Sequence, residues 1–367
     1  MTDRDYMMRA LELARKGVGA VSPNPLVGAV IVKDGRVIGE GWHEHFGGPH
    51  GERNALAACT ESPGGADLYV NLEPCCHYGK TPPCTEAIME SGIRRVVVGT
   101  EDPDPRVAGK GIRLLRENGI EVETGVMKQE CEELNRVFFH FVKSGTPYVV
   151  MKYAMTMDGK IATAAGNSRW ITGERAREKV HEDRNRYSAV MAGVGTVLSD
   201  DPLLTCRMPG GRNPVRIICD TRLRTPLASM VVRTAGAVPT VIATGCRAEE
   251  ALRPYCEAGC RVLPVPAPDG KLDLKVLMEK LGETGIDSVL LEGGGTLNWS
   301  ALKSGIVNRV QAYIAPKLFG GRDALSPVEG EGVEMPGFSF LLAEPVITRI
   351  GEDILIESEV TGCLQGS

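Results

Sequence analysis

Short apolar runs that are typical of buried strands alternate with helical segments along most of this 367-residue chain. In the first part of the chain, residues 66–72, 94–100 and 120–126 form such runs, and stretches with helical spacing separate them. Strands that alternate with short helices build an α/β layer in which at least part of the sheet is parallel. The pattern therefore predicts the α/β fold class.

The alternation starts afresh after the segment Ser144-Gly145-Thr146-Pro147, whose small and turn-forming residues are typical of a connection. A chain of this length normally forms more than one domain. We therefore expect two domains, residues 1–145 and residues 146–361, each with its own α/β layer. The second domain shows no repeat of the first.

Three local patterns give predictions that a structure can check. Two β-rich runs flank Asp34-Gly35, a dipeptide suited to a type I′ turn, so we expect a β-hairpin over residues 26–42. Apolar residues at helical spacing predict one helix over residues 130–141. The apolar run at residues 188–197 predicts a strand.

Composition restricts the partners and the compartment. The net charge of -5 gives no general attraction for nucleic acid, so we expect none as a partner. No apolar run approaches the roughly 18–20 residues that cross a bilayer, and the first residues do not resemble a signal peptide. Eleven cysteines, an odd number, are more typical of buried thiols in a reducing compartment than of a disulfide framework. We therefore expect a cytoplasmic protein without a membrane partner.

Two short motifs indicate a hydrolytic zinc site. His50-Gly51-Glu52 opens an expected helix, and Pro74-Cys75 follows an expected strand. The combination H-x-E, then P-C-x-x-C, is the signature of zinc deaminases. One imidazole and two thiolates leave a fourth position for water, whose pKa the metal lowers toward ~7. Glu52 would not bind zinc but would move a proton from the water to the ring nitrogen and then to the departing ammonia.

The second thiolate does not stand at the usual spacing. Position 78 is Tyr78, and Cys76 points about 100° away from Cys75 on a helix start. Cys84 begins the next expected helix, whose N-terminus favours a thiolate. We therefore expect His50, Cys75 and Cys84 as the zinc ligands. A structural zinc closed by a fourth ligand, Cys76 or His77, is the alternative.

The second half contains a glycine turn after an apolar strand, in the sequence "SVLLEGGGTL". Three glycines between a strand and a helix allow backbone N–H groups to approach a phosphate, and the helix dipole assists. The turn is not the G-x-G-x-x-G of a Rossmann fold. A nicotinamide site here would therefore need a different fold.

The chain resembles the bifunctional riboflavin-biosynthesis deaminase/reductase family over nearly its whole length. The deaminase half of that family is similar to the segments "SPNPLVGAVIV", "PHGE", "LEPCCHYGKTPPC" and "EDPDPRVAGKG". The reductase half is similar to "VMKYAMTMDGKIA", "NSRWITG", "MAGVGTVLSDDPLLTCR" and "LLEGGGTLNWSAL". The resemblance implies a cytidine-deaminase-like three-layer domain followed by a dihydrofolate-reductase-like domain. It also implies zinc and NADPH as cofactors, with deamination of a pyrimidine ribosylamine 5′-phosphate before reduction of its ribosyl group to a ribityl chain.

The resemblance further implies which residues bind. The deaminase substrate would contact Asn24, His43, His77, Lys80 and Asp102. The cofactor would contact Ala154, Trp170, Thr196, Asp200, Gly294, Gly295, Thr296 and Leu297. The reductase substrate would contact Lys152, Ser168, Arg184, Leu204, Arg207 and Glu292. Arg184 and Arg207 suit a bidentate clamp on the sugar phosphate.

Some features stay open at this point. Position 104 is Asp104 where the family has asparagine, so an amide contact to the substrate is not expected there. No residue can be named for the 2′-phosphate of NADPH. The oligomeric state is also open, with a homo-oligomer among the options. The main rival function is a nucleic-acid deaminase with an appended domain, which would need a basic groove.

Overall fold

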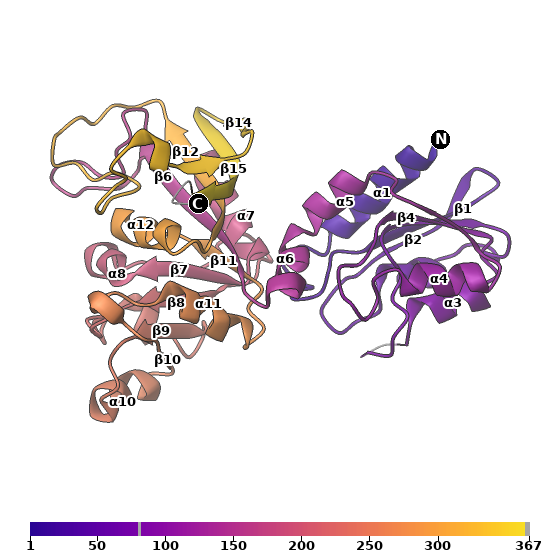
Figure 1. The fold of residues 1–367 in the computed structure, drawn as a ribbon, viewed down its shortest axis with the longest axis horizontal. Coiled ribbons are helices and arrows are strands. Elements are labelled where there is room, and N and C mark those ends of the chain that lie inside the picture. Colours follow the sequence, from indigo (N-terminus) through magenta and orange to yellow (C-terminus); the bar gives the residue numbers. More distant parts are fainter. Residues whose placement is uncertain (80–81, 364–367) are drawn as a thin grey trace. The chain divides into compact units, whose positions relative to one another are not determined.

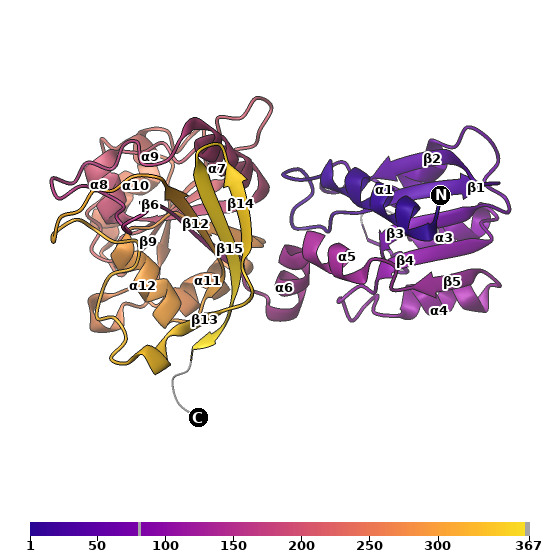
Figure 2. The same ribbon diagram turned by 90° about the horizontal axis from the view of Figure 1, so that it is seen from above.

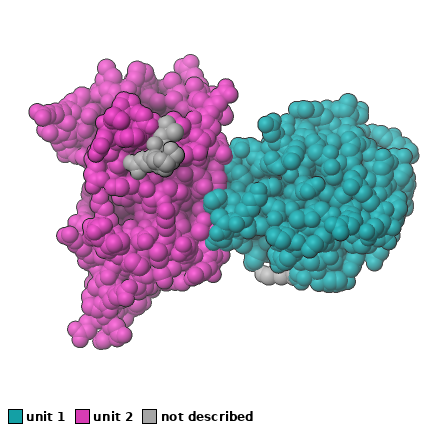
Figure 3. All heavy atoms as spheres, viewed as in Figure 1, with its two compact units in different colours: residues 1–145 teal, residues 146–367 magenta. Residues whose placement is uncertain are grey.

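A computed structural model describes residues 1–79 and 82–363 of the chain (Figure 1). Contacts within the chain define two compact units, Met1–Gly145 and Thr146–Ser367 (Figure 3). Each unit is an α/β structure in its described part, so the predicted fold class is confirmed. No helix in the described ranges has the length and hydrophobicity that a bilayer crossing requires.

The described part of unit 1 contains one mixed sheet of five strands. Its order is β2-β1-β3-β4-β5, with β1 antiparallel to both of its neighbours and β3, β4 and β5 parallel. The strands are β1 (Gly28–Lys33), β2 (Arg36–Trp42), β3 (Asp67–Leu72), β4 (Arg95–Thr100) and β5 (Glu121–Thr124). The helices are α1 (Asp3–Arg15), α2 (Gly51–Ala57), α3 (Cys84–Glu90), α4 (Lys110–Glu117), α5 (Lys128–Leu134) and α6 (Arg136–Ser144).

Alternating side chains of these strands build two cores, one on each face of the sheet. Val30, Tyr69 and Val97 pack with α1 and with Cys131 of α5. Their sequence neighbours, such as Ile31 and Val96, face the opposite side and pack with α2, α3 and α4. Figure 1 shows the resulting three layers, with α1 and α5 on one side and α3 and α4 on the other.

The hairpin prediction is confirmed, and the prediction of one long helix is wrong. Asp34 and Gly35 connect β1 to β2 with φ values of 49° and 73°, as a type I′ turn requires. The expected helix over 130–141 is interrupted at Asn135, which separates α5 from α6. The Asn135 side chain accepts a bond from the Leu26 N–H at 2.8 Å and donates to the Leu26 carbonyl at 2.9 Å. This distant partner explains the break.

The described part of unit 2 contains a ten-stranded sheet. Its main order is β10-β9-β8-β7-β11-β6-β12-β15-β13, and β14 pairs with β15. The first seven strands in this order, β10-β9-β8-β7-β11-β6-β12, are parallel to one another. The strands β13, β14 and β15 run antiparallel to their partners. Figure 2 shows β12, β15 and β14 side by side at one end of the sheet. The strands are β6 (Tyr148–Thr156), β7 (Ala189–Gly193), β8 (Val215–Cys219), β9 (Thr240–Thr244), β10 (Arg261–Pro264), β11 (Ser288–Leu291), β12 (Val307–Ala315), β13 (Phe340–Leu342), β14 (Val346–Ile350) and β15 (Asp353–Cys363).

Helices cover both faces of the parallel part of this sheet. The helices α11 (Leu274–Gly282) and α12 (Gly295–Lys303) contribute to one hydrophobic core. The helices α8 (Val194–Asp200), α9 (Met230–Arg233) and α10 (Glu249–Glu257) contribute to a second core. A further helix, α7 (Glu174–Arg186), packs on Tyr313 and Leu355. The strand expected over 188–197 is therefore only partly right, because the chain turns at Gly193 and buries Val194 and Val197 on a helix. The carboxyl ends of the parallel strands meet at one edge, where such sheets bind ligands.

Candidate active sites

The three expected zinc ligands lie together in unit 1. His50 is the N-cap residue of α2, Cys75 follows β3, and Cys84 is the first residue of α3. The His50 Nδ1 atom is 3.5 Å from each thiol sulfur, and all three ligand atoms lie within 4.8 Å of one another. Two thiolates and one imidazole are the donor set of a zinc site with an open fourth position. These residues therefore fit a catalytic zinc.

The surroundings of the Cys75 sulfur favour the thiolate form, whereas the hydrogen bond with Cys75 and burial raise the pKa of the Cys84 thiol. The backbone N–H of Cys84 donates to the Cys75 sulfur at 3.3 Å. Hydrogen bonds from Cys84 and His50 lower the pKa of the Cys75 thiol to about 4. The Cys76 sulfur instead points to the Arg106 carbonyl, 3.8 Å away, and is not among the grouped ligand atoms. The geometry thus gives no support to Cys76 as a fourth ligand.

Glu52 lies beside this group on the first turn of α2. Its side chain is 2% exposed, and its Oε2 atom is buried with no hydrogen-bond partner among the described residues. Burial raises the pKa of Glu52 to about 7. A carboxylate with that pKa can take up and release a proton near neutral pH.

His43 lies against the zinc ligand His50, and Asn24 bonds to His43. The His43 ring is buried and packs edge-on against the His50 ring, with 5.2 Å between the ring centroids. The Nδ1 atom of His43 is 2.9 Å from the Pro49 carbonyl, which leaves Nε2 to bond with the Asn24 amide at 3.1 Å. A donor at Nδ1 makes Nε2 the acceptor for that amide.

Two other expected substrate residues of unit 1, His77 and Asp102, lie on loops. Asp102 is 9% exposed, and burial raises its pKa to about 7. His77 has a buried Nδ1 atom without a partner among the described residues. Lys80 lies outside the described residues. Asp104 does not stand free, because Arg106 pairs with its carboxylate at 2.6 Å and lowers its pKa.

Glu73 is a site residue that the sequence analysis missed. It directly precedes Pro74-Cys75 and is 3% exposed. Its carboxylate accepts bonds from the backbone N–H groups of Asp102 at 3.2 Å, Gly109 at 2.9 Å and Ile112 at 3.1 Å. The loop that holds a zinc ligand is thereby tied to the loop that holds Asp102 and to the first turn of α4. The contact is close, because a Cβ at Gly111 would stand 2.2 Å from the Pro74 carbonyl oxygen.

We expect the Glu73→Gln variant to lose stability in unit 1 and to deaminate at least about tenfold more slowly. A neutral amide cannot replace a carboxylate that accepts three buried N–H bonds, and an unsatisfied buried donor costs about 1–3 kcal/mol. Thermal unfolding and ammonia release measure the two effects. Glu90→Gln, an exposed position on α3, is the matched control. Reduction by unit 2 should be unchanged, and an unaltered deamination rate would contradict the positioning role of Glu73.

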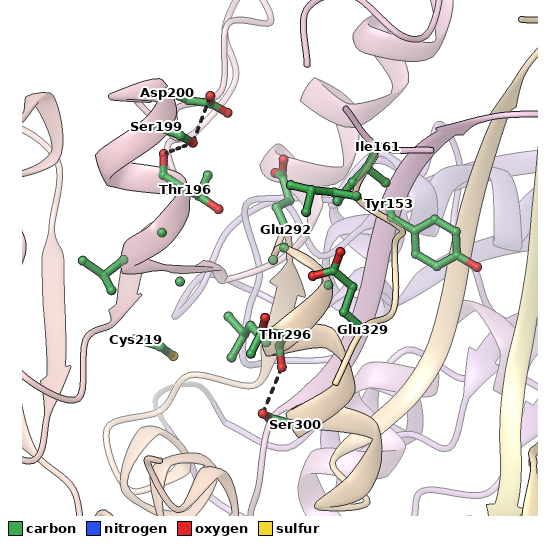
Figure 4. Close-up of a pocket in the computed structure, with 18 of the residues that line it drawn as sticks. Tyr153, Ile161, Thr196, Ser199, Asp200, Cys219, Glu292, Thr296, Ser300 and Glu329 are labelled. Carbon is green, nitrogen blue, oxygen red and sulfur yellow. Dashed lines mark hydrogen bonds between the residues drawn. The ribbon is translucent and has the colours of Figure 1, made fainter. Parts of the chain in front are cut away.

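The candidate site of unit 2 is a cavity of about 900 Å³ at the carboxyl ends of the parallel strands (Figure 4). Most of the expected cofactor contacts line it. These are Ala154, Thr196, Asp200, Gly294, Gly295, Thr296 and Leu297. Gly294 is the N-cap residue of α12, so the N-terminus of this helix, a position that favours anions, borders the cavity. Trp170 is not among the lining residues; it is 60% exposed and stacks under the Arg177 guanidinium at 4.7 Å.

Three of the expected substrate residues of unit 2 also line this cavity: Lys152, Ser168 and Glu292. Lys152 and Glu292 stand on neighbouring strands, one residue beyond the paired Met151 and Leu291. Burial lowers the pKa of Lys152, although the Glu292 carboxylate opposes this effect. The pair places a cation and an anion next to the glycine turn.

The other three expected substrate residues are not among the lining residues. The Arg184 guanidinium forms a bidentate pair with the Glu292 carboxylate, at 2.6 and 2.9 Å, and donates to the Thr205 carbonyl. Leu204 is 4% exposed and belongs to the core of α8 and α9. Arg207 is exposed and bonds to the His181 ring at 3.1 Å. The phosphate clamp of Arg184 and Arg207 stays a prediction.

Three cations at the cavity were missed by the sequence analysis. Arg222 and Arg224 follow the end of β8, and Lys271 precedes α11; all three line the cavity. The two arginines that follow an apolar strand are a feature of the sequence from which these cations could have been predicted.

The fold and the two sites define a class of protein, a zinc-dependent deaminase domain followed by a nucleotide-dependent reductase domain. Residues 1–100 match the family model described as the cytidine and deoxycytidylate deaminase zinc-binding region. Residues 147–356 match the RibD C-terminal domain. The chain belongs to the RibD family of bifunctional riboflavin-biosynthesis deaminase/reductases.

Relatives and solved structures agree over nearly the whole length. The riboflavin biosynthesis protein RibD of Actinobacillus pleuropneumoniae is 53% identical, over 97% of this chain and 95% of its own. The protein of the same name from Escherichia coli K12 is 40% identical, with coverages of 97% and 99%. A crystal structure of a diaminohydroxyphosphoribosylaminopyrimidine deaminase/5-amino-6-(5-phosphoribosylamino)uracil reductase from Thermotoga maritima is 41% identical and covers 98% of both chains with a TM-score of 0.86. Acinetobacter baumannii RibD is 36% identical, with a TM-score of 0.87 and coverages of 98% and 99%. The expected family, its two-domain fold and its zinc and NADPH cofactors are thereby confirmed.

Proposed function

We propose that residues 1–145 deaminate a diaminohydroxyphosphoribosylaminopyrimidine, and that residues 146–361 then reduce the resulting 5-amino-6-(5-phosphoribosylamino)uracil. The observation that carries this proposal is the meeting of His50, Cys75 and Cys84 beside the buried Glu52. The substrate names are those of the Thermotoga maritima relative. Both steps belong to riboflavin biosynthesis.

The deamination is a hydrolysis in which both protons of one water molecule are transferred. Zn²⁺, when held by His50, Cys75 and Cys84, lowers the pKa of a water molecule toward ~7. Glu52 would take a proton from this water and give it to the ring nitrogen, and would then take the remaining proton of the added hydroxyl group and give it to the departing amino group. A C–O bond forms, a C–N bond breaks, and ammonia leaves. The pKa of about 7 at Glu52 suits both directions of transfer.

The substrate of the first step would be held by residues around this centre. We assign Asn24 to the pyrimidine ring, because its amide bonds to His43, whose ring packs against the zinc ligand His50. His77, with an unpartnered buried nitrogen, and Asp102 are assigned to the same substrate. Lys80 is retained from the family resemblance alone.

The reduction takes place on the ribose part of the deaminated product. NADPH supplies a hydride for carbon C1′ of the ring-opened imine. Lys152 and Glu292 line the cavity, and we assign them as the groups that exchange a proton with the imine nitrogen. Arg184 holds the Glu292 carboxylate in place through its bidentate pair, so most of its effect would be positioning.

The cellular location and the partners are also proposed. A cytoplasmic location agrees with ten described cysteines that are all free thiols. The net charge of -5 gives no general attraction for nucleic acid, which agrees with the absence of a nucleic-acid partner. The homo-oligomer stays a prediction.

Incubation of the protein with the diaminopyrimidine ribosylamine phosphate tests the proposed function. Ammonia is expected without NADPH, and the nicotinamide absorbance is expected to fall only after ammonia has been released. A matched reaction with cytidine should give no ammonia. Release of ammonia from cytidine, or no signal from the ribosylamine phosphate, would overturn the substrate assignment.

A further inference from the structure

The Lys152 side chain lines the cavity of unit 2 without a hydrogen bond to hold it. Among the residues that the structure describes, its ammonium group has no hydrogen-bond or ion-pair partner, and the charged groups that face it are Glu292 after β11 and Asp183 and Arg184 of α7. The Glu292 carboxylate is already bonded to Arg184. Burial disfavours the charged form of an ammonium group, and it lowers the pKa of Lys152. Another group is therefore needed to keep this cation in place and protonated.

The ring of Tyr313 lies beneath the Lys152 ammonium group. Tyr313 stands on β12 opposite Ala154 of β6, so its side chain leaves the sheet on the same face as Lys152, two residues earlier on β6. The Lys152 Nζ atom lies over this ring, 5.5 Å from its centroid. A cation within about 6 Å of an aromatic ring face is attracted by the quadrupole of the ring. This contact uses none of the three N–H donors of the ammonium group.

Tyr313 is itself held in one position. Its side chain is 0% exposed, and its hydroxyl donates to the Asp183 carboxylate at 3.3 Å. Asp183 is buried on α7 and also accepts from the Lys179 ammonium at 2.7 Å. Burial and the Asp183 carboxylate raise the pKa of the Tyr313 hydroxyl, so this hydroxyl remains a donor. Hydrogen bonds in such a chain polarise one another, which makes the ring richer in electrons and more attractive to a cation.

We infer that Tyr313 is a positioning residue of the reductase site, which holds the Lys152 ammonium group by a cation–π contact and keeps it charged for the substrate. Tyr313 is not among the residues that line the cavity, so it acts through Lys152. The inference rests on the proposed reductase function, in which Lys152 exchanges a proton with the imine nitrogen. Hydride addition at C1′ moves the C=N electron pair onto this nitrogen, which then takes one proton. A charged Lys152 with free N–H donors can supply that proton.

The test compares Tyr313→Met and Tyr313→Phe with the wild-type chain. Methionine removes the ring and fills irregular gaps in a core, whereas phenylalanine keeps the ring and loses only the hydroxyl. Tyr148→Met is the matched control, because Tyr148 is also a buried tyrosine whose hydroxyl donates to a carboxylate, that of Glu359 at 3.2 Å, and it lies outside the cavity lining.

Two measurements are made on each variant. Competitive acetylation of the lysines over a range of pH, analysed by mass spectrometry, gives the pH at which Lys152 loses its proton. The exposed Lys303 is the internal reference. The second measurement is the pH profile of kcat for reduction of the deaminated substrate.

The titration midpoint of Lys152 is expected to fall by about 0.4–1.5 pH units in Tyr313→Met, the shift that corresponds to the loss of one cation–π contact. The ring stabilises the charged form, so without it the proton leaves at lower pH. The alkaline limb of the kcat profile should move to lower pH by the same amount. Both shifts should be less than half as large in Tyr313→Phe, and Tyr148→Met should show neither.

An unchanged midpoint in Tyr313→Met would overturn the inference, and so would an equal shift in Tyr148→Met, which would indicate a general loosening of the sheet. A full shift in Tyr313→Phe would assign the effect to the hydroxyl rather than the ring, and this nearly isosteric variant decides the matter even if Tyr313→Met does not fold. A lower midpoint with an unmoved alkaline limb would contradict the use of a charged Lys152 in the reduction. Acetylation needs neither cofactor nor substrate, so a wild-type chain that reduces nothing would overturn the proposed function separately.

Discussion

The Glu52→Gln variant is expected to keep its zinc and to lose deamination by about 10²–10⁴-fold, the range that a general acid–base group contributes. Glutamine has nearly the same shape as glutamate but cannot carry a proton between water, ring nitrogen and leaving group. The side chain is 2% exposed, so no solvent base stands close enough to replace it. Ammonia release measures the rate, and elemental analysis measures the zinc.

Two controls separate a chemical role of Glu52 from a structural one. Glu117→Gln makes the same change at an exposed position on α4 and should leave deamination unchanged. Reduction of the pre-deaminated substrate by the Glu52→Gln variant should also be unchanged, because that chemistry is assigned to unit 2. If deamination survives with zinc bound, the assignment of Glu52 is wrong. If zinc is lost, Glu52 is needed for the metal site rather than for the proton transfer.

Features of the fold that depend on nearby residues could be predicted from the sequence. The hairpin around Asp34-Gly35 follows from a turn that needs positive φ at both positions. The break at Asn135 could not be predicted, because its partner, Leu26, is 109 residues away and both bonds are to backbone. The turn after Gly193 was missed for a related reason: Val194 and Val197 are buried as strand residues would be, but by a helix packed on the sheet.

The same distinction holds for the sites. His50, Cys75 and Cys84 could be found because zinc demands particular residue types at particular places in a strand and helix pattern. Glu73 could not, since its three partners are backbone N–H groups, which carry no residue signature. For Arg184, the sequence offers a cation suited to phosphate, but Glu292, 108 residues away, already accepts two of its N–H bonds.

The two units use the same end of their sheets in different ways. In unit 1, β3 and β4 are followed by the loops of Cys75 and Asp102, and Glu73 joins these loops so that few side chains form a compact centre. In unit 2, the loops after β6, β7, β8 and β11 are spread along one cavity of about 900 Å³. A hydrolysis needs one metal and one proton carrier, whereas a hydride transfer has to hold a dinucleotide and a second substrate together. The difference in extent follows from the difference in chemistry.

The Cys84→Ala variant is expected to lose zinc and with it all measurable deamination. Even the loss of a residue that only supports a ligand weakens metal binding by 10–100-fold, so the loss of a ligand should weaken it by more than about 100-fold. The remaining pair, His50 and Cys75, offers only two donors to a metal that is bound by at least three protein ligands in catalytic sites. Zinc content after dialysis against a chelator and the rate of ammonia release are the measurements.

Cys76→Ala is the matched control. It also replaces a cysteine by alanine, but at the position directly after Cys75. The Cys76 sulfur lies 3.8 Å from the Arg106 carbonyl and apart from the three grouped ligand atoms, so this variant should keep its zinc and its deamination. Both variants should reduce the pre-deaminated substrate at the wild-type rate, which shows that unit 2 is folded. Zinc loss in Cys76→Ala with retention in Cys84→Ala would reverse the ligand assignment. Zinc loss in both would favour a closed site with four protein ligands, which has no position for the attacking water.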